Sequence, residues 1–154
     1  MRIGVLGGSF NPPHNGHLIV ASDAFEALGL DRLLIVPASA TPLKATADGA
    51  GPAERLEMCR LAFGGDPRFE VSSMEIDRGG LSFTVDTLEA LAASNPGAEL
   101  VLLLGKDSFL TVDRWRRPER IRELARFAVL TRGADGESEG VPEGVVPVTT
   151  RRVD

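Results

Sequence analysis

The chain has 154 residues, of which 43% are hydrophobic and 25% charged, and its net charge is −5. These values are typical of one folded globular domain and exclude a disordered or fibrous chain, while the acidic charge disfavours broad binding to nucleic acid or anionic lipid. One cysteine and two histidines exclude an intrachain disulfide and leave too few soft ligands for a structural zinc site.

No run of residues approaches the roughly 18 to 20 apolar positions of a membrane span. A strand-like run follows Met1 and Arg2 directly, which is unlike a signal peptide. We therefore expect a cytoplasmic protein with no membrane and no nucleic-acid partner, and the sequence leaves a homo-oligomer open.

Short apolar runs alternate with helical patterns along the chain, which predicts a parallel sheet with crossover helices. The predicted strands are residues 2–6, 32–36, 69–72, 99–104 and 127–131. Apolar residues at helical spacing predict helices around residues 18–28, 56–63 and 88–92. Residues 105–124 predict one or two short helices with a break near Trp115. We expect a single α/β domain over residues 1–154.

Two stretches are predicted to be loops: residues 38–52, rich in Ala, Thr, Gly and Pro, and the Gly- and Glu-rich residues 133–144. In an open parallel sheet, ligands bind beyond the carboxyl ends of the strands. Four unusual segments follow predicted strands, and the fold should bring them together: residues 7–17, 37–44, 82–86 and 105–115.

The first of these segments gathers both histidines of the chain, His14 and His17, behind the glycine pair Gly7 and Gly8. Glycines allow backbone N–H groups to approach an anion closely, and a helix starting near Asn15 would add its positive dipole end. The two imidazoles fall about one turn apart and can both donate to phosphate oxygens. This pattern predicts a phosphate site.

Other interpretations of the same segment are weaker. One alternative is a tight strand-to-helix turn with exposed histidines. This interpretation would have to account for two glycines, two prolines and both histidines within eleven residues. A catalytic metal site needs a third protein ligand, and no acidic residue lies on the same turn. The glycine spacing of a dinucleotide fingerprint and the Gly-Lys-Ser/Thr of a P-loop are both missing.

Residues 7–18 resemble the signature of the HxGH nucleotidyltransferases, and most of all that of the bacterial nicotinate-nucleotide adenylyltransferases. The resemblance continues through residues 37–44, 55–58, 82–87 and 105–109 and Trp115. It implies a Rossmann-like open parallel sheet with helices on both faces. It also implies transfer of the adenylyl group of ATP, with Mg²⁺ carried by its phosphates, to nicotinate mononucleotide. The acceptor phosphate is already an anion, so no strong general base is needed.

The resemblance implies roles for individual residues. The backbone of Gly8, Ser9 and Phe10, together with His14 and His17, would hold the ATP phosphates, with His17 closest to the transition state.

Three more residues complete the implied ATP side. Lys44 would add positive charge near the phosphates. The resemblance implies a catalytic role for Lys44, as for the two histidines, and also a contact between Lys44 and nicotinate mononucleotide. Gly105 and Asp107 would lie against the adenosine, although an ordinary strand-to-helix turn capped by Asp107 is an alternative.

On the acceptor side, the resemblance implies that Trp115 stacks on the pyridine ring and that main-chain N–H groups near Thr84 and Arg116 receive the carboxylate. Asp86 would order this loop. Half-buried packing is the alternative for Trp115. Cys59 and the leucine-rich helical stripes are expected to be core.

Two departures from the family pattern stand out. Leu43 occupies the position where the family often has His before the lysine. The family's Ser-Ser-Thr-x-x-Arg type segment, which closes over ATP, would begin about where Arg151 and Arg152 stand, so we expect this segment to be lacking. A related HxGH enzyme, such as a phosphopantetheine adenylyltransferase or a cytidylyltransferase, and a catalytically silent nucleotide-binding module remain alternatives.

Overall fold

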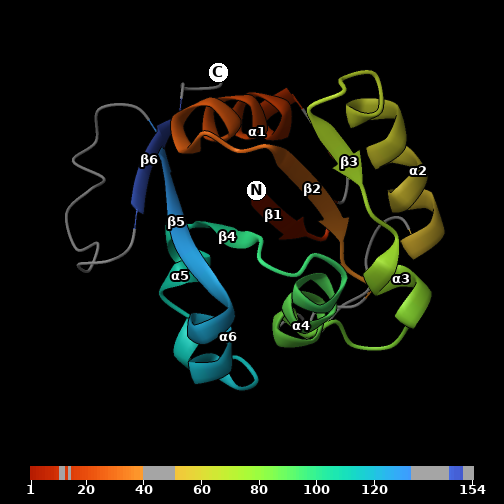
Figure 1. Ribbon diagram of the computed structural model, residues 1–154. Coiled ribbons are helices and arrows are strands. Elements are labelled where there is room, and N and C mark those ends of the chain that lie inside the picture. Colours follow the sequence, from red (N-terminus) through yellow and green to blue (C-terminus); the bar gives the residue numbers. More distant parts are fainter. Residues whose placement is uncertain (11–12, 14, 40–50, 133–145, 151–154) are drawn as a thin grey trace.

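The computed structural model describes residues 1–10, 13, 15–39, 51–132 and 146–150. Six parallel strands form one sheet in the order β3-β2-β1-β4-β5-β6 (Figure 1). The strands are β1 (Arg2–Gly8), β2 (Arg32–Pro37), β3 (Phe69–Val71), β4 (Glu99–Gly105), β5 (Ala125–Arg132) and β6 (Val146–Thr150). The helices are α1 (Asn15–Leu28), α2 (Pro52–Phe63), α3 (Met74–Arg78), α4 (Thr84–Ser94), α5 (Lys106–Phe109), the 3₁₀ helix η1 (Val112–Arg114) and α6 (Pro118–Leu124).

Both faces of the sheet are buried, which explains why its strands are continuous apolar runs. Side chains alternate between two cores, as β4 shows: Val101 and Leu103 join one, whereas Leu100, Leu102 and Leu104 join the other. The first core lies under α1 and α2, and the second under α4, η1 and α6. Figure 1 shows α1 along one side of the sheet and α4 and α6 on the other. The predicted α/β architecture with helices on both faces is confirmed.

The strand order places a topological switch point between β1 and β4, because the chain runs outward from β1 in one direction and from β4 in the other. A crevice opens beyond the carboxyl ends of the strands at such a point. Gly8 ends β1 and Gly105 ends β4, so the two strands on either side of the switch point both end in glycine.

Several element boundaries differ from the prediction. Gly7 and Gly8 extend β1, because they stay in register with Val36 and Pro37 of β2. Pro52, predicted to close a loop, is the first residue of α2, a position where its missing N–H and fixed φ are favourable. The remainder of that loop, residues 40–50, and the predicted connection 133–144 lie outside the described residues.

Two elements were not predicted. Helix α3 has only five residues, too few for a helical repeat to show in the sequence. Strand β6 lies at the sheet edge and contains Pro147, a residue that disfavours a strand assignment and is tolerated in edge strands. Within the described part of the chain, no helix is long and apolar enough to cross a membrane.

Candidate active site at the carboxyl ends of β1 and β4

The glycine pair at the end of β1 has room for a side chain at both positions. A Cβ at Gly7 would come no closer than 3.8 Å to another residue, the Val36 carbonyl, and one at Gly8 would meet the Phe10 ring at 3.5 Å. Neither glycine has a positive φ. At Gly4, by contrast, a Cβ would lie 2.5 Å from the side chain of Leu30. Packing therefore favours glycine at position 4 more strongly than at positions 7 and 8.

Phe10 holds the turn that follows. Its φ of 48° lies in the left-handed region, which a bulky residue adopts only when its surroundings enforce it. The ring is 3% exposed and packs edge-on against His17, with 5.0 Å between centroids, and against Phe63 at 6.1 Å. His17 lies in the first turn of α1, as predicted, and is half-buried. His14 lies outside the described residues.

Arg55 ties the loop after β1 to the loop after β2. Its side chain is only 6% exposed, and its guanidinium donates to the carbonyls of Ser9 (2.7 Å), Ala38 (2.7 Å) and Ser39 (2.9 Å). The Ala38 N–H donates in turn to the Gly8 carbonyl at 2.8 Å. A buried positive charge thus lies directly behind the proposed phosphate loop.

Sequence reasoning assigned no role to Arg55, although a signal was present. Arg55 precedes Cys59 by four residues and so lies on the same buried face of α2. Cys59 itself is a core residue, as predicted, with 0% exposure. Burial raises the pKa of its thiol to about 11, against the lowering effect of the Arg55 charge. A thiol with this pKa is no nucleophile at neutral pH.

The start of α4 forms another wall. Thr84 is the first residue of this helix, and no described side chain caps its N-terminus. The Arg116 guanidinium stacks on the Phe83 ring at 3.8 Å, and Arg117 pairs with Glu89 of α4 at 2.9 Å. These two contacts hold the segment after η1 against the beginning and middle of α4.

Trp115 lies in this clamped segment, between η1 and α6, where the predicted helix is interrupted. Its indole N–H donates to the Thr111 hydroxyl at 3.0 Å, and its half-buried ring packs against the second core. Trp115 therefore does pack in part against the core, as the alternative interpretation proposed, but one portion of its side chain stays accessible. Hydrogen bonding and packing together fix the orientation of the ring.

Gly105 and Asp107 lie at the carboxyl end of β4. Gly105 is exposed, and a Cβ there would meet no described atom within 4 Å. It is also the N-cap residue of α5, so the alternative in which Asp107 caps the turn is wrong. Asp107 is exposed in the first turn of α5.

A buried carboxyl group lies behind α4. Glu75 of α3 is 8% exposed and accepts hydrogen bonds from the hydroxyls of Thr87 (2.5 Å) and Ser82. Burial raises the pKa of Glu75, while both hydroxyls and the Arg78 charge oppose that rise. Glu75 was not among the predicted residues, because a carboxylate in a five-residue helix leaves no burial pattern in the sequence.

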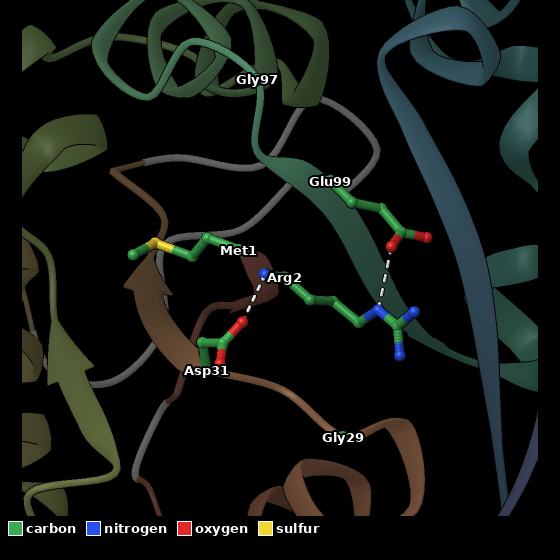
Figure 2. Close-up of a pocket in the computed structure, with 6 residues that line it drawn as sticks. All are labelled: Met1, Arg2, Gly29, Asp31, Gly97 and Glu99. Atoms are coloured by element: carbon green, nitrogen blue, oxygen red, sulfur yellow. Dashed lines mark hydrogen bonds and ion pairs between the residues drawn. The ribbon is translucent and has the colours of Figure 1, made fainter.

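The amino ends of the strands, opposite the candidate site, are lined by a different set of residues. A hollow there is lined by Met1, Arg2, Gly29, Asp31, Gly97 and Glu99 (Figure 2). Within it, the Arg2 guanidinium pairs with Glu99 at 2.9 Å and donates to the Leu28 carbonyl, and Asp31 accepts from the Arg2 N–H at 2.7 Å. These polar groups tie the amino ends of the strands together, and none of the predicted site residues lies among them.

Hydrogen bonds and strand pairing thus join the four predicted segments at the carboxyl ends of the strands. Gly8 bonds to Ala38, Ser39 donates to the Ser82 hydroxyl at 2.9 Å, and β4 runs beside β1. The prediction that these segments converge is confirmed for their described parts, whereas Lys44 lies outside the described residues. Among the described residues, no group of three or more His, Cys, Asp or Glu side chains could hold a metal ion.

Comparison with known proteins gives a consistent result. The model of the cytidylyltransferase-like family matches residues 5–152. The whole chain is 48% identical to a protein of Gemmatimonas aurantiaca named probable nicotinate-nucleotide adenylyltransferase, of which it covers 76%. It is 50% identical, over 84% of its length, to a protein of the same name from Roseiflexus sp., of which it covers 65%.

The fold also matches solved structures. A Plasmodium falciparum nicotinic acid mononucleotide adenylyltransferase complexed with NaAD superimposes with a TM-score of 0.79 at 16% identity, over 99% of this chain and 77% of that one. A likeness at this identity concerns the fold. The family match and the similar sequences show that the chain belongs to the nicotinate-nucleotide adenylyltransferase branch of the cytidylyltransferase-like family.

Proposed function

We propose that the chain transfers the adenylyl group of ATP to nicotinate mononucleotide, giving nicotinic acid adenine dinucleotide and pyrophosphate. The observation that carries this proposal is the hydrogen-bonded connection between the loop after β1 and the segment that leads into α4, through Ala38, Ser39 and Ser82. The glycine loop after β1, together with His17, suits phosphates. The N-terminus of α4 and Trp115, which lies in the segment held against α4, suit an aromatic carboxylate.

The ATP half is assigned to the loop after β1. Backbone N–H groups of Gly8, Ser9 and Phe10 suit the phosphates, since a left-handed residue within such a turn helps to orient successive N–H groups toward one anion. His17 adds a donor, and the nearby Arg55 charge adds positive potential.

The remaining ATP contacts come from other segments. Gly105 is assigned to close backbone approach by the adenosine, which its open surroundings allow, and Asp107 to accepting a hydrogen bond. His14 and Lys44 keep the phosphate roles implied by the family, with Lys44 also near the acceptor phosphate. Mg²⁺ is assigned to the ATP phosphates and supplies further positive charge to them.

The acceptor half is assigned to α4 and the segment after η1. The N-terminus of α4 offers N–H groups near Thr84, and the Arg116 main chain lies on the neighbouring clamped segment. Such donors favour a carboxylate over a neutral amide, because charge-assisted hydrogen bonds are about twice as strong. The fixed Trp115 ring provides a stacking surface for the pyridine.

Positioning and charge neutralisation would provide the acceleration. An oxygen of the acceptor phosphate forms a bond to the α-phosphorus, and the bond from that phosphorus to the β-phosphate oxygen breaks. The electron pair leaves with pyrophosphate. The acceptor phosphate has a second pKa near 6 and is largely deprotonated at neutral pH, so no protein base removes a proton. His17 donates to oxygens on which negative charge grows in the transition state.

A panel of acceptors tests this proposal. Pyrophosphate release is measured with ATP and Mg²⁺ in the presence of nicotinate mononucleotide, nicotinamide mononucleotide or phosphopantetheine. We expect release with nicotinate mononucleotide well above that with the other two. Preference for phosphopantetheine would assign the chain to another transferase of the same fold, and no release with any acceptor would favour a silent binding module.

A further inference from the structure

A chain of buried and partly buried hydrogen bonds runs behind the two halves of the site. The Ser39 N–H donates to the Ser82 hydroxyl at 2.9 Å, and that hydroxyl donates to the Glu75 carboxylate. Thr87 donates to the same carboxylate at 2.5 Å and accepts from Arg78 at 3.0 Å. Ser82 and Thr87 are 8% and 1% exposed. The Thr87–Glu75 bond is buried, and the bonds from Ser39 and Arg78 are partly buried.

One end of this chain reaches the phosphate loop. Arg55 donates to the Ser39 carbonyl and to the Ser9 carbonyl, so Ser39 is held from both sides of its backbone. The other end lies in the first turn of α4, one residue beyond Asp86, because Thr87 belongs to that helix. The path therefore links Ser9 of the ATP half to the N-terminus of α4 in the acceptor half.

The path is composed entirely of polar groups that have partners. Among the described residues, no buried side-chain nitrogen or oxygen lacks a hydrogen-bond partner. A fully satisfied buried network is rigid, whereas removal of one member leaves others unpaired in a poorly solvated site. Ser82 bonds both to the loop after β2 and to Glu75, so it is a point where the two halves can be uncoupled.

We propose that Ser82 and Glu75 are positioning residues that fix the acceptor-binding start of α4 relative to the ATP phosphate loop. Neither residue touches the reacting atoms in this assignment. The inference rests on the proposed adenylyl transfer, because it concerns how the two substrates of that reaction are aligned. Alignment matters strongly for such a reaction, since a misplacement of about 1 Å can cost about 10²-fold in rate.

The test uses Ser82→Ala, which removes one oxygen atom. Each substrate still has its own contacts, so we expect each KM to change by less than about 3-fold, while kcat falls by about 10-fold or more. Binding of α,β-methylene-ATP is measured with and without nicotinate mononucleotide. The wild-type chain should show a coupling between the two ligands of about 5-fold or more, and Ser82→Ala should lose most of it.

Two further substitutions separate positioning from general loosening. Ser73→Ala is the matched control, because the Ser73 hydroxyl bonds to Asp77 at the surface of the neighbouring α3 and lies outside the path. It should leave kcat and coupling unchanged. Thr87→Val removes a donor to Glu75 while keeping the shape of the side chain, and Thr87→Ser restores the hydroxyl. We expect kcat to fall in the first and to recover in the second.

The outcomes are distinguishable. An active wild-type chain whose Ser82→Ala variant keeps both kcat and coupling would overturn this inference and leave the proposed function intact. The inference is equally overturned if Ser82→Ala raises both KM values in proportion to its loss of kcat/KM. A wild-type chain that transfers no adenylyl group would refute the proposed function itself. Should Ser82→Ala fail to fold, the Thr87 pair decides the inference by the same criteria.

Discussion

Replacing Arg55 by methionine should destabilise the fold strongly. The substitution keeps a long apolar side chain but removes three hydrogen bonds, to the carbonyls of Ser9, Ala38 and Ser39. A hydrogen bond from a charged donor contributes about 1.5–3 kcal/mol net, and a buried acceptor left unpaired costs about 1–3 kcal/mol. Water can reach the partly exposed Ser9 and Ser39, whereas Ala38 is 5% exposed.

The Ala38 carbonyl should therefore dominate the loss. The variant no longer buries a charged guanidinium, and the desolvation cost that this avoids offsets part of the loss. We therefore expect Arg55→Met to lower the free energy of unfolding by about 2–4 kcal/mol. Urea denaturation followed by circular dichroism measures this value. The matched control is Arg60→Met on the exposed face of the same helix, which should stay within about 0.5 kcal/mol of the wild type. A loss below about 1 kcal/mol for Arg55→Met would refute the reasoning.

Three other predictions concern the site and its support. His17→Ala should lower kcat by roughly 10²–10³, because one preorganised transition-state donor is lost, while its contact with Phe10 contributes only about 0.5–1.5 kcal/mol to folding. Steady-state kinetics and thermal unfolding measure the two effects. Trp115→Ala should raise the KM for nicotinate mononucleotide far more than that for ATP, and Trp115→Phe should restore most of the affinity because it keeps an aromatic face. Glu75→Gln should change how stability depends on pH. Because folding raises the pKa of Glu75 above its ordinary value of 4.5, the native state binds more protons than the unfolded state between the two values, and wild-type stability falls as pH rises through this window. The variant lacks this component, so urea denaturation from pH 4 upward should show its stability rising relative to that of the wild type.

Each of these predictions can fail in a specific way. Near-normal turnover of His17→Ala would remove the histidine from the phosphate site, and a large loss of thermal stability would give it a structural role instead. A KM raised for ATP alone would move Trp115 to the other half of the site. A constant stability difference between wild type and Glu75→Gln across the pH range would show that the carboxyl titrates alike in folded and unfolded chains.

The sequence indicated most of the sheet because its central strands are buried on both faces. Such strands are continuous apolar runs, as in residues 100–104. The edge was harder to predict. Strand β6 contains a proline and was not predicted, whereas β3 was predicted at residues 69–72 although it has only three residues. Pairing with a neighbour, which no local pattern reveals, decides whether a segment such as β6 becomes a strand.

In the candidate site too, some residues could be predicted from the sequence and others could not. The residues proposed to meet a ligand directly stand out locally, because a glycine pair, two histidines and a tryptophan in a polar run are unusual neighbours. The groups that support them do not stand out. Glu75 resembles an ordinary helical surface residue until the tertiary structure brings hydroxyls against it, and Arg55 is marked only by its position on the same helical face as Cys59. Phe10 is similar, since its left-handed φ depends on the packing of its ring against Phe63.

The most direct test of adenylyl transfer follows the oxygen atoms of the acceptor. Nicotinate mononucleotide with ¹⁸O in its phosphate is incubated with the chain, ATP and Mg²⁺, and the masses of the products are measured by mass spectrometry. Attack by the acceptor phosphate on the α-phosphorus predicts nicotinic acid adenine dinucleotide that keeps all of the label, together with unlabelled pyrophosphate. Absence of the dinucleotide, or AMP released beside a labelled pyrophosphoryl product, would contradict the account.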